Sequence, residues 1–212
     1  MKAVLIFALT LAACSNTPEP PKKQAAAPAN EPPPEVFRVK LDTSKGPVTL
    51  ELHRAWAPKG VDHIYMLTKL GYYDGDRFFR CIRNFIVQFG INGDPKTNQL
   101  WSTAFISDDP VKESNTRGFL TYAKDGPSRR STQLFINLRD NKSLDKQGFA
   151  PIGKVVEGMD VVESFYNSYG EMPSRGGQGP DPGLIETQGN DYLANHFPRL
   201  DYIRKATIAP NP

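Results

Sequence analysis

Alternating hydrophobic and polar residues predict a sheet built from short strands. The first two strands span residues 36–41 and 48–52, and the Gly46-Pro47 dipeptide between them supplies a turn, which is the pattern of a β-hairpin. Further short apolar stretches, separated by Gly, Pro, Asn and Asp, cover residues 77–82, 85–89, 119–123 and 133–137. A last alternating segment, residues 202–208, would complete the sheet.

Two segments have the spacing of a helix instead. Ala57-Pro58 opens the first, because proline suits the first turn of a helix, and Gly71 marks its end. The second is suggested by Val155-Val156 and the apolar residues that follow at helical spacing, Met159, Val162, Phe165 and Tyr166. Many short strands with a helix near each end of the strand series predict a mainly β fold, a closed antiparallel barrel whose open ends the two helices cover.

Length and charge narrow the class of protein. A chain of 212 residues with 39% hydrophobic residues can bury a full core, and it favours one domain with appendages. The net charge is only +3, and the 26 basic residues are interspersed with 23 acidic ones, which argues against nucleic acid as a partner. The three histidines, His53, His63 and His196, lack metal-ligand spacing, so we expect no metal and no cofactor. We expect a monomer.

The N-terminus predicts export. Lys2 precedes an apolar run over residues 3–13, which is too short to span a bilayer but has the length of a signal-peptide core. The run ends in Leu11-Ala12-Ala13-Cys14, which resembles the lipobox of bacterial lipoproteins. That resemblance implies a signal peptide over residues 1–13 and a lipid on Cys14, and Ser15 then favours the periplasmic face of the outer membrane in a Gram-negative organism. The alternative is an ordinary secretory signal with an incidental cysteine.

The segment after Cys14 predicts a tether. Residues 15–35 are rich in proline and poor in large apolar side chains, so they favour extended conformers and cannot form a core. We therefore expect a lipidated tether over residues 14–35 and a globular domain over residues 36–212, with an insertion around residues 166–200. Only Cys81 remains for the domain, so no intramolecular disulfide is possible, and its apolar surroundings predict a buried, inert thiol.

Three motifs identify a family. The first places an arginine and a glutamine among large hydrophobic residues: Phe78-Phe79-Arg80-Cys81-Ile82-Arg83-Asn84-Phe85-Ile86-Val87-Gln88. The second is a turn followed by an apolar strand: Ala123-Lys124-Asp125-Gly126-Pro127 with Ser131-Thr132-Gln133-Leu134-Phe135-Ile136. The third runs from Leu144-Asp145 through Gly153-Lys154-Val155-Val156-Glu157-Gly158-Met159. They resemble, in the same order, motifs of the cyclophilin family of peptidyl-prolyl cis-trans isomerases. The resemblance implies an eight-stranded barrel and proline-containing polypeptides as partners.

The chemistry of X-Pro rotation agrees with this resemblance. Resonance in the amide gives a barrier of about 18–20 kcal/mol. A guanidinium N–H can donate to the prolyl nitrogen as the amide twists, an interaction that is stronger in the transition state than in the ground state. We assign this role to Arg80. An isolated strand arginine would more often form a surface ion pair, and the surrounding motif is what favours catalysis.

The proline ring has no polar group, so its pocket should be apolar and aromatic. By resemblance, the pocket and the contacts to the substrate backbone are formed by these residues: Phe85, Ile86, Gln88, Ala123, Gln133, Phe135, Leu144 and Phe149. The aromatic and aliphatic members taken singly would more often be core residues. Gln88 and Gln133 need hydrogen-bond partners in apolar strands, and the resemblance implies that they contact substrate or orient Arg80.

Four positions depart from the family pattern. Ile86 stands where methionine is usual, Lys124 replaces a common asparagine, and Phe149 replaces a histidine of many members. Ser143 falls where a tryptophan often contacts cyclosporin, a cyclic peptide that many members bind. Rotation needs no proton transfer, so these changes leave the proposed chemistry intact.

Two functions stay open on these residues. The first is an isomerase that assists the folding of exported or membrane proteins, held at the membrane by its lipid. The second is a noncatalytic scaffold or proline-peptide binding module on the same barrel. The glycine-rich segment 174–180 is interpreted as a surface loop, because it lacks the Gly-Lys-Ser/Thr of a phosphate-binding loop.

Overall fold

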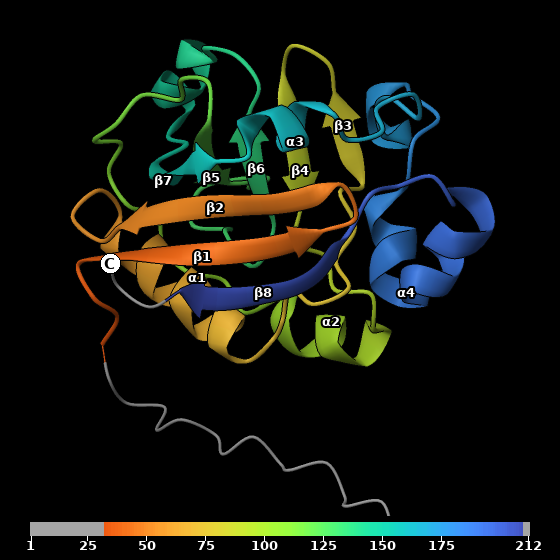
Figure 1. Cartoon of the computed structure of the whole chain (residues 1–212), viewed down its shortest axis with the longest axis horizontal. Coiled ribbons are helices and arrows are strands. Elements are labelled where there is room, and N and C mark those ends of the chain that lie inside the picture. Colours follow the sequence, from red (N-terminus) through yellow and green to blue (C-terminus); the bar gives the residue numbers. More distant parts are fainter. Residues whose placement is uncertain (1–31, 210–212) are drawn as a thin grey trace, which may run out of the picture. The chain divides into compact units, whose positions relative to one another are not determined.

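The computed structural model describes residues 32–209, and its centre is one eight-stranded antiparallel sheet that curls around a core (Figure 1). The strands, in chain order, are β1 (Val36–Thr43), β2 (Gly46–His53), β3 (Arg80–Ile82), β4 (Ile86–Phe89), β5 (Phe119–Tyr122), β6 (Leu134–Asn137), β7 (Pro151–Glu157) and β8 (Ile203–Ala209). The predicted hairpin is present, with Val39 paired to Leu50. Its turn is formed by Ser44 and Lys45 and not by the predicted Gly46-Pro47, because Gly46 and Pro47 already pair with Thr43 and Asp42 at the start of β2.

The predicted closed barrel is wrong, because the sheet stays open between two edge strands. Its order is β3-β4-β6-β5-β7-β2-β1-β8, so within residues 32–209 β3 and β8 have no strand partner on their outer sides. β3 has only three residues. The residues just before it meet the residues just before β8 through a few backbone hydrogen bonds and the isolated bridge between Arg77 and Tyr202. The sheet is therefore a curled half-barrel.

Alternate side chains of the long strands point into the curl and form the main core. Phe37, Val39 and Leu41 of β1 are buried against Leu50 and Leu52 of β2, with β7, β5 and β6 supplying the other wall. The alternation seen in the sequence therefore reports which face of each strand is buried. Cys81 lies in this core as predicted, and burial raises the pKa of its thiol.

The first predicted helix is confirmed, and the second begins later than expected. α1 (Pro58–Lys69) packs on β8, β2 and β7 with Val61, Ile64 and Leu67 buried. Val155-Val156 belong to β7, where Val155 pairs with Leu50 of β2. Gly158 then turns the chain with φ +83°, and only the short α3 (Met159–Glu163) follows. α1 and α3 lie on opposite sides of the curled sheet in Figure 1.

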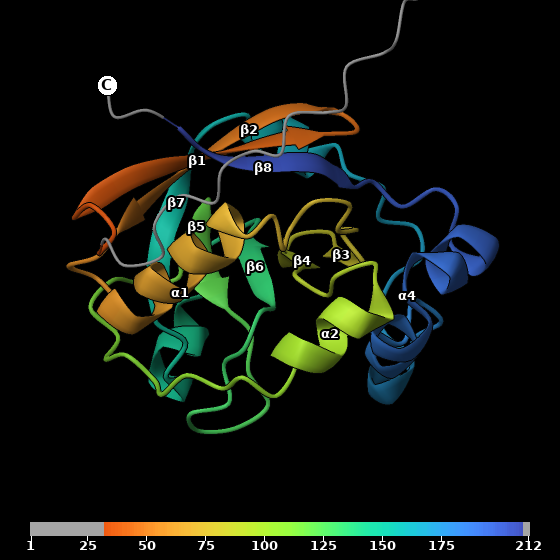
Figure 2. The same cartoon turned by 90° about the horizontal axis from the view of Figure 1, so that it is seen from below.

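Two further helices were not predicted. α2 (Pro95–Trp101) follows β4, and α4 (Pro182–His196) lies within the segment around residues 166–200 that was expected to be an insertion. Figure 2 shows the two helices side by side, and Gly189 of α4 approaches the backbone of Gly93 just before α2, with Asn190 N–H donating to the Gly93 carbonyl at 2.9 Å. The chain therefore adds a helical layer next to the β3–β4 end of the sheet.

This added layer has its own core. Phe79 and Ile91, which flank β3 and β4, pack with Ile185 and Leu193 of α4 and with Leu200. The neighbouring Phe78 instead enters the main core, where it stacks on Phe165 at 4.0 Å between ring centroids. The segment around residues 166–200 is thus packed onto the domain at the position of the predicted catalytic arginine.

The predicted signal peptide, the lipid attachment at Cys14 and most of the tether lie outside the described residues. The domain's first strand begins at Val36. Along residues 32–209, no helix combines the length and the apolar character needed to cross a membrane. The same residues contain no cluster of three or more His, Cys, Asp or Glu side chains arranged to hold a metal ion.

Candidate active site

Arg80 of β3, Gln88 of β4 and Gln133, which precedes β6, form a hydrogen-bonded row. Arg80 of β3 pairs with Gln88 of β4 in the register of the sheet, so their side chains lie on the same face. Arg80 Nη1 donates to Gln88 Oε1 at 2.9 Å, and Gln88 Nε2 donates to Gln133 Oε1 at 2.9 Å. Gln133 directly precedes β6. Gln88 therefore contacts Arg80, while the two roles predicted for the glutamines, contact with substrate and orientation of the arginine, stay predictions.

This row borders a groove of about 780 Å³. Every residue predicted for catalysis or substrate binding lines it: Arg80, Phe85, Ile86, Gln88, Ala123, Gln133, Phe135, Leu144 and Phe149. They come from β3, β4, the turn between these strands, the segment after β5, β6 and the segment before β7. The structure thus brings together residues that are separated by up to 69 positions in the sequence.

One wall of the groove is apolar and aromatic. Ile86 and Phe135 are buried, and Phe149 meets Phe135 edge to face at 5.9 Å between ring centroids. The Arg80 guanidinium carbon lies 5.6 Å from the centroid of the Phe85 ring. The groove therefore places a cation beside a surface that can hold a nonpolar ring.

A buried polar network fixes the rim that carries Leu144. The 3₁₀ helix η1 (Lys142–Gln147) contains Leu144 and Ser143, which both line the groove. Asn115 Nδ2 donates to Asp145 Oδ1 and to the Phe149 carbonyl, each at 2.8 Å. Burial alone would raise the pKa of the Asp145 carboxyl, but hydrogen bonds from Ser114 and Asn115 hold it below its usual value. Sequence reasoning did not identify Asn115, because its partners are remote in the chain.

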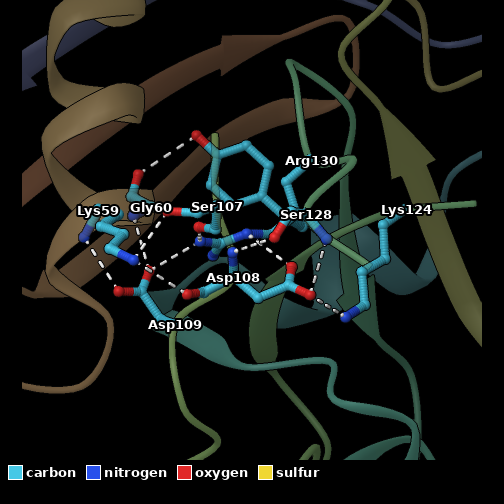
Figure 3. Close-up of polar contacts among 9 residues, drawn as sticks. Lys59, Gly60, Ser107, Asp108, Asp109, Lys124, Ser128 and Arg130 are labelled. Atoms are coloured by element: carbon cyan, nitrogen blue, oxygen red, sulfur yellow. Dashed lines mark hydrogen bonds and ion pairs between the residues drawn. The ribbon is translucent and has the colours of Figure 1, made fainter. Parts of the chain in front are cut away.

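Lys124 is held at the groove by an ion-pair cluster (Figure 3). Its Nζ lies 2.8 Å from Asp108 Oδ2, which also accepts the Ser128 N–H at 3.0 Å, and 5.6 Å from the centroid of the Phe149 ring. Burial would raise the pKa of Asp108, but the hydrogen bonds from Lys124 and Ser128 hold it below its usual value. The side chain that replaces the usual asparagine is therefore ordered by a partner of its own.

The same cluster connects the groove to α1. Arg130 is buried, and its Nη2 donates to Asp109 Oδ2 at 3.0 Å, while its Nε lies 3.4 Å from Asp108 Oδ1. Asp109 in turn accepts the N–H groups of Lys59 and Gly60 at 3.2 and 2.9 Å (Figure 3). These are first-turn donors of α1, whose N-cap residue Ala57 supplies no side-chain acceptor. Asp109 thus caps α1 from about fifty positions away.

The segment around residues 166–200 contributes to the groove, which sequence reasoning missed. Met172, Ser174 and Arg175, around the short 3₁₀ helix η2 (Pro173–Arg175), line the groove together with Pro182 and Glu186 of α4. Glu171 contacts Arg80 directly, with its carboxylate oxygens 2.6 Å from Nε and from Nη2. The glycine-rich segment 174–180 is therefore part of the loop that forms one end of the groove, and the interpretation as a plain surface loop was incomplete.

The fold and this groove define a class, a curled eight-stranded antiparallel sheet with a buried arginine beside an aromatic pocket. A profile described as "Cyclophilin type peptidyl-prolyl cis-trans isomerase/CLD" matches residues 38–179. The chain is 32% identical over 159 residues to peptidyl-prolyl cis-trans isomerase-like 1 of Rhizopus delemar, covering 72% of this chain and 84% of that protein. It is 36% identical over 132 residues to peptidyl-prolyl cis-trans isomerase-like 2 of Neurospora crassa, covering 58% of this chain and 21% of that much longer protein.

Solved structures share the fold. A crystal structure of a cyclophilin type peptidyl-prolyl cis-trans isomerase from Cryptosporidium parvum superposes with a TM-score of 0.62 and 21% sequence identity, covering 84% of this chain and 99% of that one. Another structure of the same Cryptosporidium protein was determined in the presence of the dipeptide Ala-Pro, with a TM-score of 0.59. The chain belongs to the cyclophilin-type peptidyl-prolyl cis-trans isomerase family.

Proposed function

We propose that this chain catalyses rotation about X-Pro bonds and that Arg80 is the catalytic residue. The observation that carries the proposal is a buried guanidinium at the wall of an apolar, aromatic groove. Among the described residues, hydrogen bonds use three of its five N–H donors, so Nη1 and Nη2 each keep one donor for a substrate. A donor in a groove shielded from water acts more strongly on developing charge than one in bulk water.

The rest of the groove supports the same reaction. Ile86, Phe135, Leu144 and Phe149 would hold the proline ring, leaving its amide nitrogen toward Arg80. Gln88, Gln133 and the backbone at Ala123 would pair with the peptide on either side of the ring. As the amide twists, its nitrogen becomes pyramidal and accepts an N–H of Arg80, and this bond is weaker in the planar ground state. No proton is transferred, so Phe149 can replace histidine without loss of the mechanism.

The alternative is a module that binds proline peptides without turnover. The two functions separate in one experiment on the full chain, in which NMR exchange spectroscopy measures the cis-trans exchange rate of a short Ala-Pro peptide. Catalysis predicts exchange that rises in proportion to protein concentration at substoichiometric protein. Peptide shifts that change on binding while the exchange rate stays at the uncatalysed value would support the binding module and contradict the isomerase.

We further propose that the protein is a monomer held by a lipid on Cys14 at an extracytoplasmic membrane face, the periplasmic face of the outer membrane if the organism is Gram-negative. The support is the sequence Leu11-Ala12-Ala13-Cys14 after a short apolar run and the proline-rich segment that follows it. Lipid chains contribute about 0.8 kcal/mol per buried methylene, and more than one chain is needed for stable anchoring. Exported and membrane proteins would then be the substrates.

A further inference from the structure

The proposed mechanism leaves one strong contact at Arg80 unexplained. Glu171 meets the guanidinium with both carboxylate oxygens, Oε1 at 2.6 Å from Nε and Oε2 at 2.6 Å from Nη2. This is the bidentate geometry in which arginine binds a carboxylate most strongly and with the most defined orientation. The Arg80 side chain is 6% exposed and that of Glu171 is 28% exposed, so water screens the pair only partly.

Glu171 is held in place by its own loop. The Met172 N–H donates to Glu171 Oε1 at 2.9 Å, and the Glu171 carbonyl accepts the Gly179 N–H at 2.8 Å. A side chain at Gly177 would collide with the Glu171 carbonyl oxygen, so the loop can close this tightly only because this residue is glycine. The glycines of this segment therefore let the backbone pack closely enough to hold the Glu171 carboxylate against Arg80.

The loop is in turn anchored beside Arg80. Phe79 precedes the arginine and packs with Ile185 and Leu193 of α4 in the second core. Asp181 is the N-cap residue of α4, and its side chain accepts the N–H groups of Gly183 and Leu184. The helix that follows the Glu171 loop and the residue that precedes Arg80 thus pack in one hydrophobic cluster, which holds the loop beside the arginine.

The electrostatics favour a charged pair. Burial alone would raise the pKa of the Glu171 carboxyl, but hydrogen bonds from Arg80 and from the Met172 N–H hold it below its usual value. The carboxylate is therefore ionised at neutral pH and compensates the buried guanidinium. Glu171 accepts hydrogen bonds from Nε and Nη2 of the guanidinium, and Gln88 accepts one from Nη1. These contacts leave one N–H on each of Nη1 and Nη2 for another acceptor.

We propose that Glu171 is a positioning residue for the isomerase reaction, one that locks the Arg80 guanidinium in the orientation that presents its remaining N–H groups to the substrate. This inference rests on the proposed function, because it assigns Arg80 the catalytic contact. Glu171 itself touches the arginine and not the reacting amide. Its effect should therefore appear in turnover more than in substrate binding, since the arginine bond is made mainly in the transition state.

The test compares four full-length proteins: wild type, Glu171→Gln, Glu171→Asp and the matched control Asp191→Asn. Glu171→Gln keeps the size of the side chain and removes its charge. Asp191 is an exposed carboxylate on α4 that does not line the groove, so its change to the amide controls for altering a charge in this segment. For each protein, NMR exchange gives kcat and KM on an Ala-Pro peptide, and the Arg80 Nε–H resonance reports the orientation of the guanidinium. Thermal unfolding checks that each variant is folded.

We expect Glu171→Gln to lower kcat by about ten- to a hundred-fold, since displacing a catalytic group by about 1 Å can cost a hundred-fold. KM should change by less than about three-fold. The Arg80 Nε–H resonance should broaden or exchange faster with water, Glu171→Asp should recover part of both signals, and Asp191→Asn should match wild type.

Wild-type protein without isomerase activity would overturn the proposed function, and this inference with it. Active wild type together with a folded Glu171→Gln protein whose kcat is within two-fold of wild type would overturn the inference alone. A Glu171→Gln protein that is faster than wild type would also overturn it, because Glu171 would then restrain an arginine that acts better when free.

Discussion

Asp109 should be among the most sensitive positions for stability, because it serves two partners at once. It accepts an Arg130 N–H at 3.0 Å inside the domain and caps the first turn of α1 through Lys59 and Gly60. The side chains of Arg130 and Asp109 are 2% and 1% exposed. Asp109→Ala would leave the buried Arg130 guanidinium with Asp108, 3.4 Å from Nε, as its one remaining carboxylate among the described residues, beside the Ser107 carbonyl that accepts from Nη2. It would also remove the acceptor of two helix N–H groups.

The expected loss of stability in Asp109→Ala is the sum of the costs of losing these two contacts. Removing one partner of a buried ion pair costs about 3–5 kcal/mol, and we expect the lower end because Asp108 still compensates part of the charge. Loss of a helix cap typically adds about 1 kcal/mol. We therefore expect Asp109→Ala to lower the free energy of unfolding by about 4 kcal/mol, a large part of the stability of an ordinary domain.

Urea unfolding measures this loss of stability and shows which contact causes it. The proteins compared are wild type, Asp109→Ala, Arg130→Met and the double variant. If the uncompensated guanidinium is the main cost, the double variant should be less destabilised than the sum of the single ones by about 1–3 kcal/mol. Asp42→Ala is the control, because Asp42 pairs with Arg204 on the surface at 3.0 Å and should contribute less than about 1 kcal/mol. A loss below 1 kcal/mol for Asp109→Ala, or additive single effects, would refute this reasoning.

Three further predictions concern other parts of the chain. Cys14→Ser should abolish lipid attachment and release the protein from membranes in cell fractionation, whereas a variant that is processed and retained normally would contradict the lipobox. Cyclosporin should inhibit only at micromolar concentration or above, since Ser143 stands where the family pattern has a large aromatic contact worth about 2–4 kcal/mol. Ser143→Trp should gain sensitivity to the drug. Low nanomolar inhibition of wild type would show that Ser143 does not correspond to the tryptophan of other family members. Asp76 is fully buried and has no ion-pair partner among the described residues, so burial, only partly offset by the Gly90 backbone, raises the pKa of its carboxyl well above the usual value. The folded state then holds a proton that the unfolded state releases above about pH 4, so stability should fall as pH rises from there. Asp76→Asn should raise the Tm at pH 7 by a few degrees, about 2–4 °C per kcal/mol, and much less at pH 4. An equal shift at both pH values would contradict the assignment.

The sequence predicted the parts of the fold whose contacts are local. The hairpin of β1 and β2 follows from period-two alternation on either side of a short turn, which lies at Ser44 and Lys45, two residues before the predicted position, and the turn fixes the register. The same logic brings Arg80 opposite Gln88, because a short turn at Arg83, Asn84 and Phe85 joins β3 to β4. A local turn is therefore enough to bring together two residues that lie eight positions apart in one motif.

Other elements were missed because their local pattern is weak. α4 buries only Ile185, Gly189 and Leu193 over its length, and Gly189 interrupts the helical backbone with φ +62°, so the apolar spacing gives little helical signal. Val155 and Val156 were predicted to be helical because Met159 and Val162 follow them at helical spacing. In the structure Val155 pairs with a residue of β2, about a hundred positions earlier in the chain, and the local sequence cannot indicate this partner. Tertiary pairing overrode the periodicity there.

The contacts made by Glu171 and Asp109 could not be predicted from the sequence. Each is made by a single carboxylate whose partner lies far away in the chain, Arg80 at 91 positions and Lys59 at 50 positions. The only local sign was the glycine density after Glu171, which indicates close backbone approach but does not say to what. The sequence showed that Lys124 differs from the family pattern, but it did not indicate that Asp108 is the ion-pair partner of Lys124.

The central claim is that Arg80 catalyses X-Pro rotation, and one measurement tests it most directly. NMR exchange on an Ala-Pro peptide should show that Arg80→Ala, in the full chain, lowers kcat/KM by about a hundred- to a thousand-fold, the cost of losing one charged transition-state donor. Peptide binding should persist, because the apolar wall of the groove remains. A correctly folded Arg80→Ala protein that keeps more than a third of wild-type activity would contradict the account.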